Sequence, residues 1–147
     1  MTIFRPIGMR PTITQFGHAL LEGIHGEVEA YMTTVLKGLR CPPLAVGVAT
    51  DHGHAALVLA RDVAVATLVR ELKVATTNWL KTRDGSLAEF AWQNGYAAFS
   101  ARYNQRDALV HYVRNQREHH KKESFQDELR RLLTWHEIAY DERYLWD

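Results

Sequence analysis

The sequence predicts a single α+β domain in which a small β-sheet is backed by helices. Long segments with helical apolar spacing alternate with short runs rich in valine, leucine and aromatic residues. No internal repeat or low-complexity linker divides the 147 residues, a length that suits one domain with its own hydrophobic core. We therefore expect one layered unit over residues 1–147, in which residues 137–147 form a C-terminal tail.

Two segments in the first half have the spacing of amphipathic helices. Apolar residues recur every three or four positions from Gly17 to Leu39, and Gly38 is placed to end this helix. Asp62 is placed to cap a second helix, whose apolar stripe extends from Val65 to Leu80.

The strands are predicted from three shorter segments. Leu44–Ala49 and Ala55–Ala60 are apolar runs separated by the turn Thr50–Gly53, which is typical of a β-hairpin. Phe90–Ser100 is rich in aromatic residues and is predicted to be extended, with an interruption at Gly95.

Two further helices are predicted in the second half. The first runs from about Asn104 to Lys122, and Leu109 and Val113 lie on the side that is expected to face the sheet. The second opens at Ser124, because Ser124 and Asp127 have the spacing of a capping box.

A candidate catalytic site combines Tyr112 and Gln116 with the motif His52-Gly53-His54. A helix places residues four apart on one face, so the phenol of Tyr112 and the amide of Gln116 address the same volume. Positions two apart on a strand also share a face, so His52 and His54 can offer two imidazoles to one cation. With the Gln116 carbonyl as third ligand, this nitrogen and oxygen set suits Mg²⁺ or Mn²⁺. The pattern indicates a metal-assisted tyrosine nucleophile.

Each half of this site also has an ordinary interpretation. Because the chain contains eight histidines, one His-x-His pair arises easily by chance, and turn histidines are common. A helical tyrosine such as Tyr112 is most often a core aromatic residue. The residues alone leave both alternatives open.

Basic residues are concentrated around Tyr112, although the net charge of the chain is only +1. Such an excess can attract a phosphate backbone to the nucleophile, whereas the simpler alternative is a solvated helix face. The candidate DNA-binding residues are Arg102, Arg106, Arg114, Arg117, Lys121 and Lys122.

Composition predicts a cytoplasmic protein with no membrane partner. The longest apolar runs are too short to span a bilayer, and the N-terminus lacks the layout of a signal peptide. Cys41 is the only cysteine, which excludes an internal disulfide, and we expect it to contribute to packing.

Several segments between Leu44 and Trp146 carry a family resemblance when they are taken together. They are Leu44–Gly47, Asp51–His54, Leu68–Lys73, Phe90–Tyr96, Tyr112–Gln116, Glu118–His120 and Tyr140–Trp146. Each is weak alone, but in this order and spacing they resemble the single-tyrosine transposases of the HUH class. The resemblance is to the insertion-sequence and REP-associated tyrosine transposases in particular.

The resemblance implies a ferredoxin-like, RRM-like antiparallel sheet backed by helices, with His52, His54 and Gln116 as ligands of Mg²⁺ or Mn²⁺. It implies that Tyr112 attacks a phosphodiester of single-stranded DNA, releases a 3′-hydroxyl and keeps a 5′-phosphotyrosine link. A second 3′-hydroxyl can reverse this step and join strands at a new place, as DNA transposition requires. The implied partners are single-stranded DNA hairpins at element ends. A homodimer is also expected, in which the tyrosine helix of one subunit can serve the histidine pair of the other. Other members of the family act as monomers, and the sequence does not decide between the two states.

Two departures from the family pattern bear on these expectations. Gly53 stands where the family has a bulky apolar residue, so Asp51–Gly53 is able to turn tightly and direct the two histidines to different sides. The family's first strand is apolar and central, whereas Ile3–Pro11 contains two prolines and a glycine. The first strand is therefore predicted to be either very short or eroded.

Two principal functions remain open on the sequence. The first is an active endonuclease and strand transferase acting on single-stranded DNA through Tyr112, and the second is a catalytically weakened, domesticated hairpin-DNA-binding protein. A small metalloprotein without a nucleic-acid partner is a third, more remote alternative. Because His52, His54, Tyr112 and Gln116 are all present, we favour the enzyme.

Overall fold

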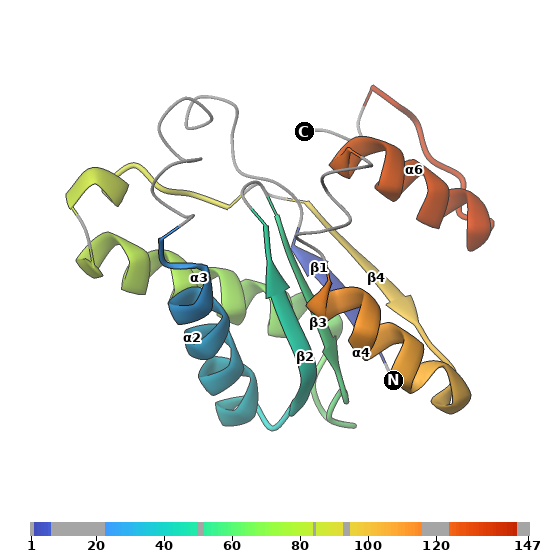
Figure 1. The fold of residues 1–147 in the computed structure, drawn as a ribbon, viewed down its shortest axis with the longest axis horizontal. Helices are drawn as coiled ribbons and strands as arrows, with labels where there is room; N and C mark the ends of the chain where they lie inside the picture. Colours follow the sequence, from blue (N-terminus) through green and yellow to red (C-terminus); the bar gives the residue numbers. More distant parts are fainter. Residues whose placement is uncertain are drawn as a thin grey trace.

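The computed structural model describes residues 2–6, 23–49, 52–83, 85–92, 95–115 and 124–143 (Figure 1). The described strands are β1 (Thr2–Pro6), β2 (Pro43–Val48), β3 (Gly53–Leu57) and β4 (Tyr96–Ser100). The described helices are α2 (His25–Gly38), α3 (Val65–Arg83), α4 (Arg106–Arg114) and α6 (Phe125–Trp135), with short 3-10 helices η2 (Gly85–Leu87) and η3 (Tyr103–Gln105).

The strands form one antiparallel sheet in the order β2-β3-β1-β4. Helix α2 connects β1 to β2 and helix α3 connects β3 to β4, so the elements follow the β-α-β-β-α-β order of the ferredoxin-like arrangement. The predicted α+β fold, a small antiparallel sheet backed by helices, is confirmed.

The first strand is short, but it is not eroded. Thr2, Ile3 and Phe4 pair with β3 on one side, and all five residues of β1 pair with β4 on the other. A proline disrupts a central strand because it lacks a backbone N–H. Pro6 is tolerated here because it is the last residue of β1 and lies beside β4 alone.

Strands β2 and β3 form the predicted hairpin, and Gly53 lies within it. Gly53 pairs with Val48, and the backbone N–H of Ala49 donates to the carbonyl oxygen of His52 at 2.8 Å. The expectation that Gly53 directs the two histidines to different sides is wrong, because the rings of His52, just before β3, and His54, within it, lie 4.9 Å apart between centroids.

The alternation of β3 gives the sheet two different faces. Ala55 and Leu57 belong to the main hydrophobic core with α2 and α3. Ala56, between them, faces the opposite way and packs with Leu109 and Val113 of α4. Helices α2 and α3 therefore cover one face of the sheet, and α4 crosses the other (Figure 1).

Helix α6 packs on β4, at the edge of the sheet. Leu129 and Leu133 contact Phe99, whereas the neighbouring Ala98 joins the core formed with α3. Because successive residues of a strand face opposite ways, α6 covers the same face of the sheet as α4.

The two predicted helix caps have different outcomes. Ser124 caps α6 as predicted, since its Oγ accepts a hydrogen bond from the backbone N–H of Asp127 at 3.2 Å. Asp62 does not cap α3, which begins at Val65. The Asp62 carboxylate instead pairs with the guanidinium of Arg40 at 2.5 Å, and this hydrogen bond lowers the pKa of Asp62.

The remaining boundaries also differ from the predicted ones. β3 begins at Gly53 and ends at Leu57, so it is shifted towards the N-terminus of the predicted strand, whereas α2 and β4 are shorter than predicted. Helix α2 begins at His25, and residues 17–22 of the expected helix lie outside the described residues. β4 forms only the second half of the expected extended segment, because Phe90 is buried edge-on against Trp92 before the strand begins. Cys41 is fully buried in the main core, as expected.

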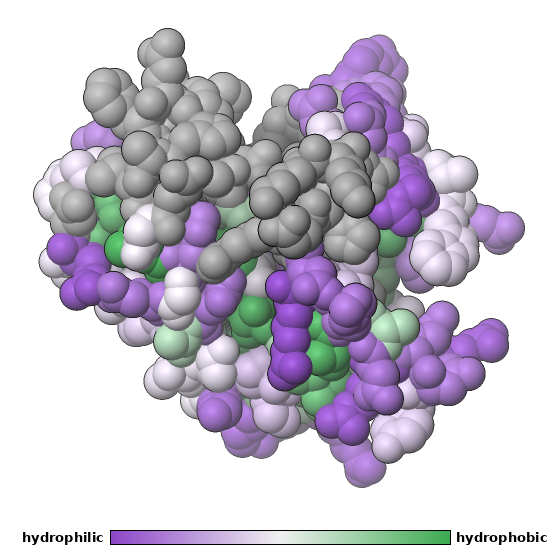
Figure 2. All heavy atoms as spheres, viewed as in Figure 1, coloured by the Kyte–Doolittle hydropathy of each residue, from purple (hydrophilic) through white to green (hydrophobic). Residues whose placement is uncertain are grey.

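On the face seen in Figure 2, apolar residues show as small patches between hydrophilic ones. None of the described helices is both long and apolar enough to cross a bilayer.

Candidate active site and metal centre

Strand β3 places the histidine pair on the face of the sheet that α4 covers. His54 lies two residues before Ala56, which packs against α4. The rings of His52 and His54 are 4.9 Å apart between centroids and nearly perpendicular. Their exposed fractions are 0% and 1%, so the two imidazoles converge in the protein interior.

A carboxylate from α6 reaches this histidine pair. Glu128 is only 2% exposed, and its Oε2 lies 3.9 Å from Nε2 of His54. One ligand atom from each of His52, His54 and Glu128 lies within 4.8 Å of the other two. Because α6 covers the same sheet face as α4, it can deliver this side chain to the histidines.

Tyr112 of α4 lies beside His54 on the same face. Their ring centroids are 6.0 Å apart in an edge-to-face arrangement, and the phenol oxygen is inaccessible to solvent. Leu109 and Val113 anchor α4 to the sheet on either side of Tyr112. The predicted nucleophile and the predicted histidine pair thus lie together within one chain.

A glycine in β2 allows α4 to approach the sheet closely. A Cβ built on Gly47 would lie 2.3 Å from the carbonyl oxygen of Val113, which is far inside van der Waals contact. Gly47 pairs directly with His54 across the hairpin, and Val113 is the residue after Tyr112. The absence of a side chain at position 47 therefore sets how closely Tyr112 approaches His54.

The structure places only part of the remaining predicted site. Arg106 and Arg114 are the first and last residues of α4, Arg102 precedes it, and all three are exposed. They therefore present positive charge around the helix that carries Tyr112. The other predicted site residues lie outside the described residues, namely Gln116, Arg117, Lys121 and Lys122.

Glu128 is the site residue that sequence reasoning missed. The apolar stripe of α6 contains Leu129, Leu132 and Leu133, and Glu128 occupies a position within that stripe, one turn before Leu132. A carboxylate in an apolar helix face is rarely buried unless it is paired or binds a metal. The carboxylate of Glu128 within an apolar stripe was therefore the sequence feature that could have identified it as a site residue.

The arrangement combines a potential cation site with a potential nucleophile. Two imidazoles and one carboxylate are a ligand set found at transition-metal and Mn²⁺ sites. A phenol beside such a site can attack an electrophile whose charge the cation neutralises. The exposed arginines of α4 match an anionic substrate.

The known proteins to which this chain is similar are transposases. Residues 13–116 match the family described as "Transposase IS200 like". The fold is similar to that of a presumed transposase from Deinococcus radiodurans, with a TM-score of 0.57 and 13% identity over 80% of this chain and 91% of that chain. It is also similar to a REP-associated tyrosine transposase bound to a REP hairpin, with a TM-score of 0.53 and 18% identity over 76% of this chain and 63% of that chain.

A search of curated proteins found no match. The two structural likenesses are at low sequence identity and support the fold, whereas the family match spans most of the sequence. The chain belongs to the IS200-like transposase family.

Proposed function

We propose that this transposase cleaves and rejoins single-stranded DNA with Tyr112 as the nucleophile, assisted by a divalent cation at His52, His54 and Glu128. The observation that carries the proposal is the position of the Tyr112 ring, 6.0 Å from the ring of His54 in a buried His-His-Glu cluster. A tyrosine that only packs in the core does not need a cation site beside it. A tyrosine that acts as a nucleophile needs help to ionise, because an unperturbed phenol with a pKa near 10 is almost entirely protonated at neutral pH.

In the proposed step, Oη of Tyr112 attacks the phosphorus of a DNA phosphodiester. The bond from phosphorus to the 3′-oxygen breaks, the departing strand leaves with a 3′-hydroxyl, and the other strand stays attached through a 5′-phosphotyrosine bond. The phenol gives up its proton as it attacks, and the leaving 3′-oxygen takes up a proton, so the number of protons is unchanged over the step. Attack by a different 3′-hydroxyl reverses the step and joins two strands, so no external energy source is required.

The residues present fit a divalent cation. His52, His54 and Glu128 provide two nitrogen donors and one carboxylate from two elements of the fold, and their ligand atoms already lie within 4.8 Å of one another. When bound, the cation would neutralise charge on the scissile phosphate and favour ionisation of the phenol. The mixed donor set suits Mn²⁺ or Mg²⁺, as the sequence predicted, and Gln116 remains a further predicted ligand.

Single-stranded DNA hairpins are the proposed partner. A structural relative is bound to a REP hairpin, and the exposed Arg102, Arg106 and Arg114 provide the positive charge that such a partner requires. A homodimer remains a prediction. The proposed site does not depend on it, because His54 and Tyr112 meet within one chain.

The test is a covalent-adduct assay. Hairpin oligonucleotides with randomised single-stranded flanks carry a fluorophore at the 3′ end, because the proposed tyrosine bond retains the strand on that side. The protein is incubated with the DNA and Mn²⁺ or Mg²⁺, denatured, and resolved by electrophoresis. We expect a fluorescent protein band that is lost in Tyr112→Phe and without metal.

Tyr103→Phe is the matched control, since Tyr103 precedes the same helix and is 83% exposed. It should form the adduct at the wild-type level. An adduct that persists in Tyr112→Phe would refute the role of Tyr112. Hairpin binding without any adduct, with either metal, would favour the domesticated DNA-binding protein instead.

A further inference from the structure

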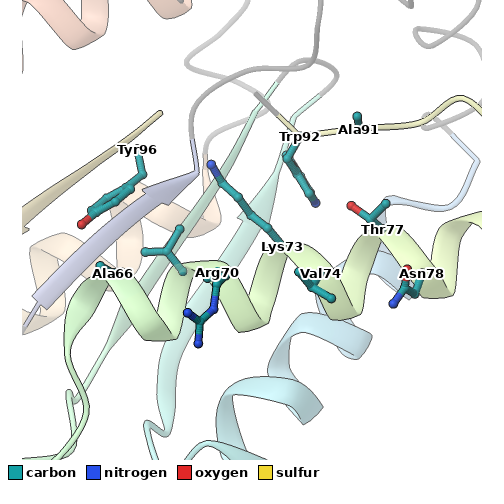
Figure 3. A pocket seen from close by; sticks show the side chains of 10 residues that line it. Ala66, Arg70, Lys73, Val74, Thr77, Asn78, Ala91, Trp92 and Tyr96 are labelled. Atoms are coloured by element: carbon teal, nitrogen blue, oxygen red, sulfur yellow. The ribbon is translucent and has the colours of Figure 1, made fainter. Parts of the chain in front are cut away.

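A second candidate site lies on the other face of the sheet. A cavity of about 390 Å³ opens between α3 and the start of β4 (Figure 3). Tyr96 lines it and is two residues from Ala98, which packs into the core with α3, so the cavity is on the face opposite the His-His-Glu cluster. Its volume is within the range of small-molecule sites. Its lining includes Arg70, Lys73, Thr77, Trp92 and Tyr96.

The cavity contains a partly desolvated cation. The side chain of Lys73 rises from α3 between Tyr96 and Trp92, and its Nζ donates to the carbonyl oxygen of Gly95 at 2.6 Å (Figure 3). Burial lowers the pKa of Lys73 to about 8. Arg70, one turn earlier on α3, adds an exposed guanidinium at the same wall, where it also pairs with Glu71 at 2.9 Å. Because an ammonium carries three N–H donors, Lys73 can keep the Gly95 acceptor and also donate to an anionic ligand in the cavity.

Two aromatic residues accompany this cation. Trp92 is 8% exposed, and its indole nitrogen is buried without an acceptor among the described residues. In Figure 3 this nitrogen is directed towards α3, between Lys73 and Thr77. Leaving a buried donor unsatisfied is costly, so a ligand that brings an acceptor would be favoured. Tyr96 is 40% exposed and presents a ring that a planar ligand can reach.

We propose that this cavity binds an unpaired nucleotide of the single-stranded DNA substrate. The base would lie against Tyr96 and accept a hydrogen bond from the Trp92 indole, while Lys73 and Arg70 contact the adjacent phosphate. Aromatic stacking combined with a cationic wall is the usual chemistry of single-strand recognition. The proposal rests on the proposed function for its substrate, but it concerns a different face of the sheet.

The discriminating measurement is the affinity for two DNA hairpins, with and without an unpaired thymidine tail, in the presence of EDTA so that no cleavage occurs. Lys73→Gln is compared with Lys81→Gln, because Lys81 lies on the same helix but does not line the cavity. We expect Lys73→Gln to weaken binding of the tailed hairpin by roughly tenfold or more. The blunt hairpin should change by no more than about twofold, and Lys81→Gln should affect both hairpins equally and weakly.

A crosslinking experiment on the wild-type protein gives an independent result. A tail that carries 5-iodouracil should crosslink under irradiation to Trp92 or Tyr96, identified by mass spectrometry. If Lys73→Gln does not fold, Tyr96→Leu replaces it with the same expectation for the tailed hairpin. Equal losses in Lys73→Gln and Lys81→Gln, or crosslinks confined to other residues, would overturn the proposal.

These outcomes are separate from those that test Tyr112. If the wild-type protein forms no covalent adduct but binds the tailed hairpin more tightly than the blunt one, the proposed chemistry is refuted and the nucleotide site stands. A full adduct in the wild type, together with no tail preference, would refute the nucleotide site and leave the proposed chemistry standing.

Discussion

The carbonyl oxygen of Val113 sits directly above Gly47, where a Cβ would lie only 2.3 Å away. Gly47 is the cross-strand partner of His54, and Val113 is the residue next to Tyr112. One missing side chain therefore controls the separation between the proposed nucleophile and the proposed metal ligand. A backbone carbonyl cannot rotate away as a flexible side chain can, so an added methyl group must move the whole helix.

Gly47→Ala should accordingly displace α4 and lower the rate of adduct formation by at least about tenfold, since small misplacements of a catalytic group are costly. Overpacking should also reduce the free energy of unfolding by about 1–3 kcal/mol. Adduct formation is followed in time, and chemical denaturation measures stability. Gly26→Ala is the control, because a Cβ there meets nothing within 4 Å and alanine favours the helix. Unchanged kinetics in Gly47→Ala would contradict this role.

Glu128→Gln should weaken metal binding, because it removes the negative charge from the proposed cation site while preserving side-chain size. We expect the affinity for Mn²⁺, measured by calorimetry, to fall by roughly tenfold or more. Glu89→Gln removes the same charge from an exposed position and should leave the affinity unchanged. An Mn²⁺ affinity that is equal in Glu128→Gln and the wild-type protein would exclude Glu128 as a ligand.

A mixture of Tyr112→Phe and His54→Gln proteins should form no adduct. Each variant lacks one half of a site that is assembled within a single chain, so mixing cannot supply the missing half. The measurement is the adduct assay on equal amounts of the two proteins, after circular dichroism has established that both are folded. Recovery of the adduct would instead indicate that the tyrosine of one subunit serves the histidines of another.

The affinity for a tailed hairpin should fall as the pH rises through about 8, because Lys73 then loses the charge that contacts phosphate. Arg70 also lines the cavity and pairs with Glu71 at 2.9 Å, and the pKa of about 8 assigns the change over this pH range to Lys73. Affinities measured between pH 7 and pH 9 should show this decrease in the wild-type protein and a smaller one in Lys73→Gln. Parallel curves would contradict the assignment.

Titration of Lys73 should also change the stability of the fold. Stability should rise with pH, whereas the affinity for the tailed hairpin should fall. Its pKa is about 8 in the folded protein and near 10.4 in an unfolded chain. Between these values the unfolded chain binds more protons, so the destabilisation that burial causes is fully present below about pH 8 and is relieved as the pH rises. Thermal unfolding of Lys73→Gln and wild type at pH 7 and pH 9.5 should show a wild-type gain that the variant lacks.

Local sequence patterns predicted much of the fold because they act over a few residues. The β2–β3 hairpin and the Ser124 cap of α6 follow from turn residues and a side-chain hydrogen bond close in sequence. The start of α3 was mispredicted because Asp62 has a long-range partner, Arg40, which no local rule reveals. The choice between a short and an eroded first strand stayed open for a similar reason, since the effect of Pro6 depends on which strands lie beside it.

The candidate site was predictable only in part. His52, His54 and Tyr112 stood out because their spacing and the family resemblance drew attention to them, and the fold brings them together. Glu128 comes from a helix far along the chain, and only packing decides that it points to the histidines. The close approach of α4 to the sheet at Gly47 is a contact between two backbone segments, and patterns of side chains in the sequence do not predict such a contact.

The position of β1 has a consequence for how the molecule folds. Thr2 pairs with Leu57 on one side and with Ser100 on the other, so the segment made early in synthesis takes its place between segments made much later. Contacts between such distant residues slow folding, because a long loop must close before they form. The β2–β3 hairpin can form by itself, but β4 joins the sheet only through β1. Docking of the N-terminal strand is therefore expected to limit the folding rate of the whole sheet.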